Sequence, residues 1–238
     1  MTENPPRNPG NVTNLAAPDR VRWLAVLRSL LNGPVQSPTI DLRAALKMAE
    51  GHNRAFVIAC LRGVHSARSG SATGIDFGLP RMPLPLPASQ GSRASELVWL
   101  AYLKFVMGDP SAAAWLGAAC DALDPTALKT TASDNPEPWW QNEMLMLHAL
   151  HSYALIHRDG RAIAKTLACA DFHIREIQPD HATNEPWAAH AYASHIDGRV
   201  TAETLLHSAQ IQNAGKLTEV SRLIVSDAVA ALEAAASA

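Results

Sequence analysis

The sequence predicts an all-α protein of stacked antiparallel helical hairpins that form a ring or an open arc. Alanine is abundant and aromatic residues make up only 5% of the chain, which is typical of helices that pack closely through small side chains. Three segments beginning at Glu96, Glu143 and Glu185 each combine an apolar run, a Gly-Asp or Asp-Gly turn and a second helical run. A repeat of roughly 40 to 50 residues made of two helices is typical of stacked hairpins.

The N-terminal part of the chain is predicted to be a disordered arm followed by helices. Residues 1–19 hold four of the 16 prolines, so we expect this arm to lack regular structure. The first helix is predicted to begin at an Asp19 cap and to end at Gly33, because its apolar residues lie at helical spacing. A second helical block, residues 37–70, contains a probable break near Gly51 that would divide it into two helices.

A long loop rich in glycine, serine and proline is predicted at residues 69–92. Loops of this length inside a compact domain are usually lids, binding loops or linkers. Its "PLPLP" stretch, residues 83–87, favours the polyproline II conformation. Because few helical residues precede the loop, we interpret it as an excursion within one domain that covers residues 20–238.

The two helices of each predicted hairpin differ in character. Residues 143–156 are apolar nearly all round the helix, so this helix is expected to be buried on most sides. Residues 161–177 are amphipathic, with charged residues off a single apolar stripe. That stripe consists of Ile163, Leu167, Ala170, Ile174 and Ile177. An inner buried helix followed by an outer amphipathic one predicts a double-layered ring or arc.

This alternation of inner and outer helices resembles α/α-toroid domains, as in terpene cyclases and (α/α)-barrel glycan-processing enzymes. The resemblance covers residues 20–236 and concerns architecture. The Asp-rich DxDD and DDxxD motifs of terpene cyclases are absent, so cyclisation chemistry is not implied. The stretch "FHIREIQPDHATNEPWAAHAYA" with the later "LLHSAQ" is also similar to a group of bacterial proteins without an established activity.

Histidines are the strongest compositional anomaly, because eight of the ten lie between residues 148 and 207. If the starts of the inner helices point at one mouth of a ring, their glutamates converge with histidines on a central cavity. Such a set can act as acid and base when burial tunes the pKa values. The candidate catalytic residues are Glu143, His148, Glu185 and His190.

The same glutamates have a simpler explanation as helix-start residues, where a negative charge favours the positive end of the helix dipole. We favour this capping interpretation for Glu96, Glu143 and Glu185. A residue five positions after such a glutamate lies about 140° round the helix. His148 and His190 therefore cannot face a cavity together with the glutamate of their own helix, although pairs between helices remain open.

A metal site is not predicted. Imidazole and carboxylate groups bind Zn²⁺, but no HExxH spacing is present. If a metal were bound, the candidate ligands would be His148, His181 and His190. His148 could equally be a histidine of the hydrophobic core that hydrogen-bonds to a backbone carbonyl or to a carboxylate.

Aromatic residues near the starts of the inner helices are suited either to rimming a ligand cavity or to packing between hairpins. We favour packing. The candidate ligand-binding residues are His151, Trp139, Trp187 and Tyr192.

Composition excludes several classes of function. The formal net charge of −2 gives no electrostatic footprint for nucleic acid. No basic run or stretch of 18 apolar residues suggests a membrane partner, and no secretory signal is evident, so a cytoplasmic location is expected. The isolated Cys60, Cys120 and Cys169 are interpreted as reduced buried thiols. No phosphate-binding loop or GxSxG elbow is present, and no cofactor is predicted.

Two functions remain. The first is a binding or scaffold module that uses its concave face, or residues 83–87, for a protein or small-molecule ligand. The second is a hydrolase or lyase, with or without a metal, whose central cavity is lined by histidine and glutamate. The sequence favours the first.

Overall fold

The all-α class is confirmed by the computed structural model, which describes residues 17–32, 53–70, 92–125, 137–179, 183–211 and 217–237. These ranges contain nine helices and no strand, and none of the helices is long and apolar enough to cross a membrane. The helices are α1 (Ala17–Leu31), α3 (Asn53–Arg68), α4 (Ser92–Val106), α5 (Pro110–Ala122), α6 (Glu137–His157), α7 (Gly160–Glu176), α9 (Ala189–Ser194), α10 (Arg199–Ile211) and α11 (Glu219–Ala236).

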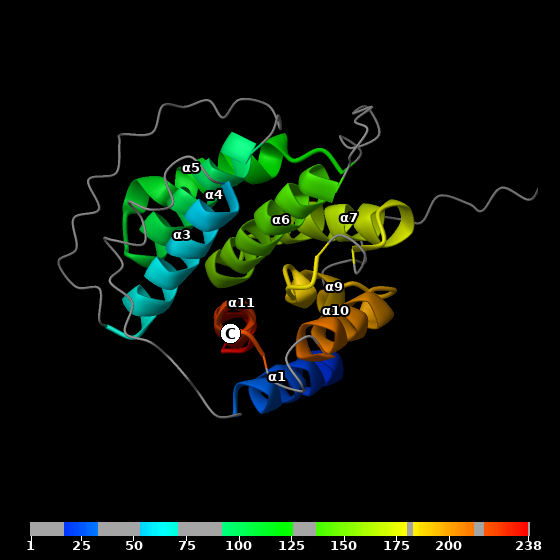
Figure 1. Ribbon diagram of the computed structural model, residues 1–238. Coiled ribbons are helices and arrows are strands. Elements are labelled where there is room, and N and C mark those ends of the chain that lie inside the picture. Colours follow the sequence, from blue (N-terminus) through cyan, green and yellow to red (C-terminus); the bar gives the residue numbers. More distant parts are fainter. Residues whose placement is uncertain are drawn as a thin grey trace, which may run out of the picture.

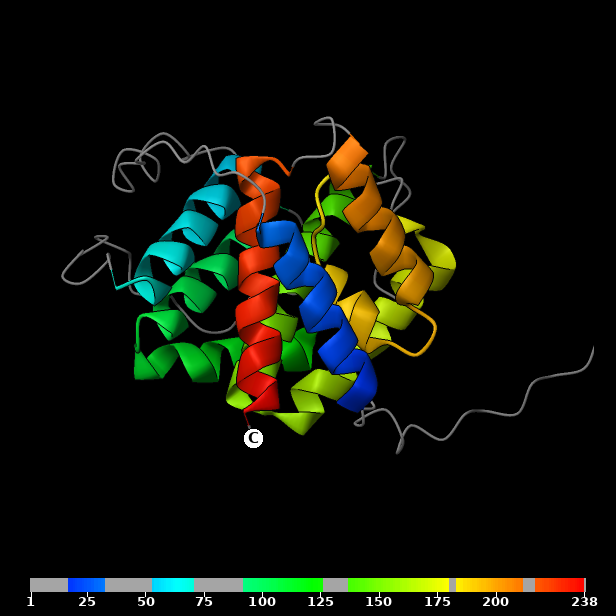
Figure 2. The ribbon, with the colours of Figure 1, turned by 90° about the horizontal axis from the view of Figure 1, so that it is seen from below.

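Helix α11 lies between α3 and α1 in Figure 1. It packs against α1, α3, α6 and α9, and Figure 2 shows α1 running alongside it. Around it, α3 packs against α4, α4 against α6, and α6 against α9. Helices α5, α7 and α10 pack against α4, α6 and α9, respectively. The helix that ends the described chain therefore contacts helices from the beginning, the middle and the later part of the sequence.

Short polar turns begin several of these helices, as the sequence predicts. The Asp159 side chain accepts hydrogen bonds from two backbone N–H groups at the start of α7. Asp109 accepts one backbone hydrogen bond, from the N–H of Ser111 at the start of α5, where Pro110 occupies the first turn and needs no N–H partner. At the start of α11, the Thr218 hydroxyl accepts a hydrogen bond from the N–H of Ser221. Each cap satisfies a backbone donor that the helix itself leaves without a partner.

The contrast between inner and outer helices also agrees with the prediction. Every residue from 143 to 155 in α6 is buried. In α7, Leu167 and Ala170 are buried, whereas Arg161 and Arg175 are exposed. Helix α6 therefore lies in the interior, and α7 covers it with one apolar face.

Three predicted helix starts are wrong. Helix α6 begins at Glu137 and α4 at Ser92, so Glu143 and Glu96 lie more than one turn inside their helices and not at the helix starts. Pro138 lies in the first turn of α6, a position that suits proline.

The third error concerns the segment that starts at Glu185, where the helix begins only at Ala189. Ala188 has a φ of +57°, and this left-handed residue separates the preceding turn from α9. The predicted turn that follows α9 does require its glycine, because a Cβ on Gly198 would lie 2.1 Å from the Tyr192 carbonyl oxygen.

Predictions at the N-terminal end are tested only in part. Helix α1 begins at Ala17 rather than at an Asp19 cap, and α3 occupies the second half of the predicted block. The positions of Gly33, Gly51 and the loop residues 71–91 lie outside the described residues.

Candidate functional site

A cluster of buried polar side chains surrounds Asp227, which lies on α11 and is 3% exposed. Its carboxylate forms an ion pair with the Arg68 guanidinium of α3, at 2.6 Å from Nη1 to Oδ1. It accepts a hydrogen bond from the Tyr102 hydroxyl of α4, at 3.0 Å. From α6, His148 Nε2 lies 3.2 Å and Ser152 Oγ 3.0 Å from Oδ2. Three helices therefore direct donors at one carboxylate; we call these five residues the Asp227 cluster.

The hydrogen bonds assign the protons of the two histidines nearest to Asp227. His148 Nδ1 accepts the backbone N–H of Ala188 at 3.1 Å, so its proton is on Nε2 and is donated to Asp227. The Ser152 hydroxyl donates to Asp227, so it accepts from Nε2 of His190, 3.0 Å away. His190 Nδ1 is buried and has no partner within the described ranges.

The cluster contains a buried ion pair between Asp227 and Arg68. Burial alone would raise the pKa of Asp227, but the Arg68 charge and the hydrogen bonds from His148 and Ser152 hold that pKa below its ordinary value. Burial lowers the pKa of His190 well below its usual range, and the neighbouring His148 and His151 lower it further. The neutral form of the His190 imidazole is therefore favoured beside the buried ion pair.

Aromatic rings enclose His148 on two sides. The Trp99 ring stacks on it at 5.7 Å and 18°, and the Trp187 ring meets it edge-on at 5.6 Å and 89°. Both tryptophans are fully buried. Trp99 Nε1 donates to the Leu145 carbonyl at 2.8 Å. These rings act as packing partners of the cluster.

The other predicted ligand-binding residues lie in the packed interior or at the start of α6. His151 Nδ1 lies 2.8 Å from Thr166 Oγ1, and the His173 ring contacts the Tyr192 hydroxyl at 3.0 Å. His151 and Tyr192 are fully buried. Trp139 is half-buried in the first turn of α6. In this structure these residues do not line the pocket described below.

Glu185 lies apart from the histidines, beside the start of α11. The Ser221 hydroxyl donates to it, and the Thr218 hydroxyl lies 3.3 Å from its carboxylate. Arg54 Nη2 is 3.8 Å from the same group. Its contacts are therefore with the capped end of α11, whereas the sequence placed it at the start of its own helix.

Glu143 occupies a third environment. Burial, together with the charge of Asp124, raises its pKa to about 7. Its electrostatic neighbours also include Cys169 and Tyr192. Of the four predicted catalytic residues, the structure thus brings together His148 and His190, whose ring centroids are 4.6 Å apart, and keeps both glutamates elsewhere.

Metal coordination finds no support in the part of the chain that the structure describes. No group of three or more histidine, cysteine, aspartate or glutamate residues there is arranged to hold an ion. His148 Nε2 is already engaged with Asp227. The third candidate ligand, His181, lies outside the described residues.

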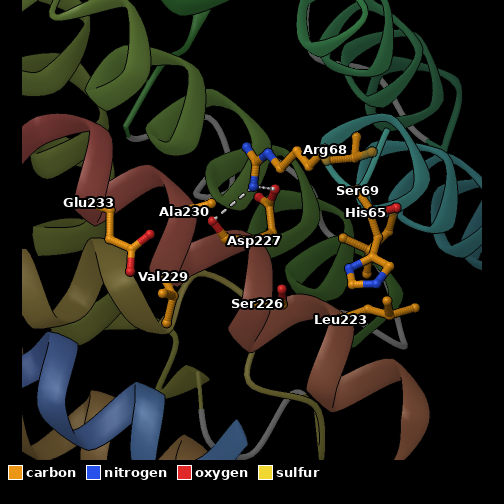
Figure 3. A pocket seen from close by; sticks show the side chains of 11 residues that line it. His65, Arg68, Ser69, Leu223, Ser226, Asp227, Val229, Ala230 and Glu233 are labelled. Carbon is orange, nitrogen blue, oxygen red and sulfur yellow. Dashed lines mark hydrogen bonds and ion pairs between the residues drawn. The ribbon is translucent and has the colours of Figure 1, made fainter. Parts of the chain in front are cut away.

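A pocket of about 250 Å³ lies between α3 and α11 (Figure 3). The Arg68–Asp227 ion pair belongs both to this pocket and to the buried cluster. The Arg68 side chain is 23% exposed. Other polar lining residues are His65, Ser69, Ser226 and Glu233, and apolar ones include Leu61, Val64, Leu223 and Val229. The buried network therefore reaches the surface at this pocket.

Comparisons with known proteins identify no relative. No protein-family model, no curated protein and no solved structure matches the chain. The resemblance to α/α-toroid domains and to a bacterial group stays a prediction.

Sequence reasoning missed the residue at the centre of the cluster. In "EVSRLIVSDAVAALEAAA", Asp227 is the one acid between the first turn and Glu233, and Ile224 and Ala231 flank it at helical spacing. A lone charge on the apolar face of a helix indicates a buried partner. That pattern could have identified Asp227, but it names neither Arg68 nor His148.

Proposed function

We propose that this protein is a helical binding module that holds a small ligand in the pocket between α3 and α11. One observation carries the proposal: the Arg68–Asp227 ion pair is anchored in the interior and still reaches the pocket. A charged pair that is partly open to a pocket presents fixed polar groups to a ligand.

Preorganisation supports this function. Asp227 and the Tyr102 hydroxyl, 2.8 Å from Arg68 Nη2, hold the guanidinium in place without a ligand. Binding to such a fixed group avoids the entropy cost of ordering a flexible arginine. Ligand pockets usually measure about 300–1,000 Å³, so the volume of about 250 Å³ suits a ligand smaller than a typical drug.

We further propose that the helices form the predicted arc and that α11, not a ligand, occupies most of its concave side. The packing of α5, α7 and α10 on α4, α6 and α9 supports an outer and an inner layer. The contacts of α11 with α3, α6 and α9 support an arc filled by α11 (Figure 1). The ligand then binds where α11 meets α3, at the edge of the concave face.

The enzyme alternative has weaker support. Ser152, His148 and His190 are each 0% exposed, so a substrate has no direct access to these side chains in this structure. Ser152 also donates its proton to a carboxylate, which does not activate it as a nucleophile. The buried network fits the positioning of Arg68 better than it fits catalysis.

The test is a titration with hexan-1-ol, a neutral probe small enough for the pocket, followed by amide chemical shifts. We expect the largest shifts in α3 and α11. Ser226→Phe, which places a ring in the pocket, should abolish them, whereas Ser208→Phe on α10 should not. Shifts that are spread over the whole chain, or that survive Ser226→Phe, would count against the pocket.

A further inference from the structure

We propose that the ligand of the α3–α11 pocket is a small carboxylate with an apolar tail, bound through Arg68; this rests on the proposed function. The geometry of the ion pair carries the inference. The two charged groups at the floor of the pocket are not equally available to a ligand.

Asp227 has its acceptor capacity occupied from the interior. Arg68 and Tyr102 contact Oδ1, while Tyr102, His148 and Ser152 contact Oδ2. A carboxylate with this many donors gains little from another one. A ligand amine or hydroxyl donor therefore finds no open acceptor on Asp227.

Arg68, in contrast, has donor capacity left. Nη1 serves the Asp227 carboxylate and the Asp227 carbonyl at 3.3 Å, and Nη2 serves the Tyr102 hydroxyl. Nε has no hydrogen bond within the described part of the chain and is not among the buried atoms there that lack a partner, and the Arg68 side chain is 23% exposed. The charged floor of the pocket thus offers a donor to the ligand, and the complementary ligand group is an acceptor.

A carboxylate is the acceptor that gains most from this arrangement. A hydrogen bond between two ionised groups is shorter and about twice as strong as a neutral one. The other acid of the pocket, Glu233, is already paired with Arg28 at 2.5 Å. Its charge is therefore compensated at the far end of the groove, where Figure 3 places it away from His65.

The apolar lining residues define the rest of the ligand. Leu61 and Val64 come from α3, and Leu223 and Val229 come from α11. Their side chains offer an apolar tail a surface on each helix. A short alkyl or aryl chain beside one carboxylate satisfies both parts of the pocket.

The first experiment compares three probes of equal chain length on the wild-type protein at neutral pH, by calorimetry and amide shifts. We expect hexanoate to bind about tenfold more tightly than hexan-1-amine, with hexan-1-ol between them. Binding of the alcohol or the amine at the pocket with equal or higher affinity would overturn the carboxylate assignment but keep the proposed function. No binding by any of the three probes would overturn both.

A matched pair of arginine variants tests the contact itself. Arg68→Lys keeps a positive charge beside Asp227 but removes the Nε–H, so most of the preference for hexanoate over hexan-1-ol should be lost. Arg62→Lys is the control: Arg62 lies on the same helix with a similar side-chain exposure, 27%, and pairs with Glu219 outside the pocket. Unchanged hexanoate affinity in folded Arg68→Lys would refute the role of Arg68. The wild-type comparison of probes stands even if that variant fails to fold.

Discussion

One buried carboxylate, Asp227, belongs to α11, and another, Glu185, contacts the start of α11. Each lies near an arginine of α3. Asp227 pairs with Arg68 at 2.6 Å, and the side chains of this pair are 2% and 23% exposed. Glu185 lies 3.8 Å from Arg54, whose side chain is 56% exposed. The first pair is largely removed from water, while the second keeps its arginine in solvent.

The difference shows two ways to bury an acid. Asp227 stays ionised in the interior because a guanidinium and three other donors replace its hydration. Glu185 needs no close cation, because the hydroxyls of Thr218 and Ser221 satisfy it at a helix start. Removing the first acid leaves a charge without a partner, whereas removing the second leaves only neutral groups.

Lowering the pH should have the largest effect on the free energy of unfolding, and it should act through the buried histidines. Burial lowers the pKa of His151 to about 3 and of His173 to about 4, and His190 is lowered as well. Between the ordinary histidine pKa of about 6.5 and these lowered values, the unfolded chain binds protons that the folded chain does not. Stability therefore falls as the pH drops below about 6.5. Each histidine should cost roughly 2 kcal/mol between pH 6.5 and 5.

Urea unfolding at pH 7 and at pH 5 measures this loss. His151→Gln should reduce the difference between the two pH values by about the contribution of one histidine, roughly 2 kcal/mol. The control is His207→Gln on the exposed side of α10, which should leave the difference unchanged. An equal pH dependence for all three proteins would show that buried histidines do not set the acid limit.

Asp227→Asn should have the next largest effect. The variant keeps the shape of the side chain but leaves Arg68 without its counter-charge, which should lower the free energy of unfolding by about 3 kcal/mol or more. Chemical denaturation measures the loss. Adding Arg68→Met should recover part of it, because the uncompensated charge is then gone. Additive losses in the double variant would mean that the ion pair is not the source of the effect.

Glu185→Gln should have the smallest effect, about 1 kcal/mol or less, because the amide oxygen can still accept from the hydroxyls and the Arg54 pair is exposed. The same denaturation series provides the value. A loss as large as that of Asp227→Asn would remove the distinction between the two acids.

Local sequence patterns account for much of the fold but little of the candidate site. The buried character of α6 and the amphipathic character of α7 follow from side-chain periodicity, and Asp159 and Gly198 mark turns by their own chemistry. The sequence around the glutamates did not predict their environments. Glu143 and Glu185 look alike in sequence, yet one lies inside a helix and the other accepts hydroxyl hydrogen bonds beside the start of a different helix.

The sequence by itself determined that the chain is helical, that residues 143–156 form a buried helix and that residues 161–177 form an amphipathic one, because periodicity and turn chemistry act over a few residues. The tertiary structure alone decided that α11 packs against α1, α3, α6 and α9 and that Asp227, 79 residues from His148, is the partner of that histidine. Hydrogen-bond and ion-pair partners are fixed by long-range packing, which no local spacing encodes. The placement of Arg68 at the pocket follows from that packing as well.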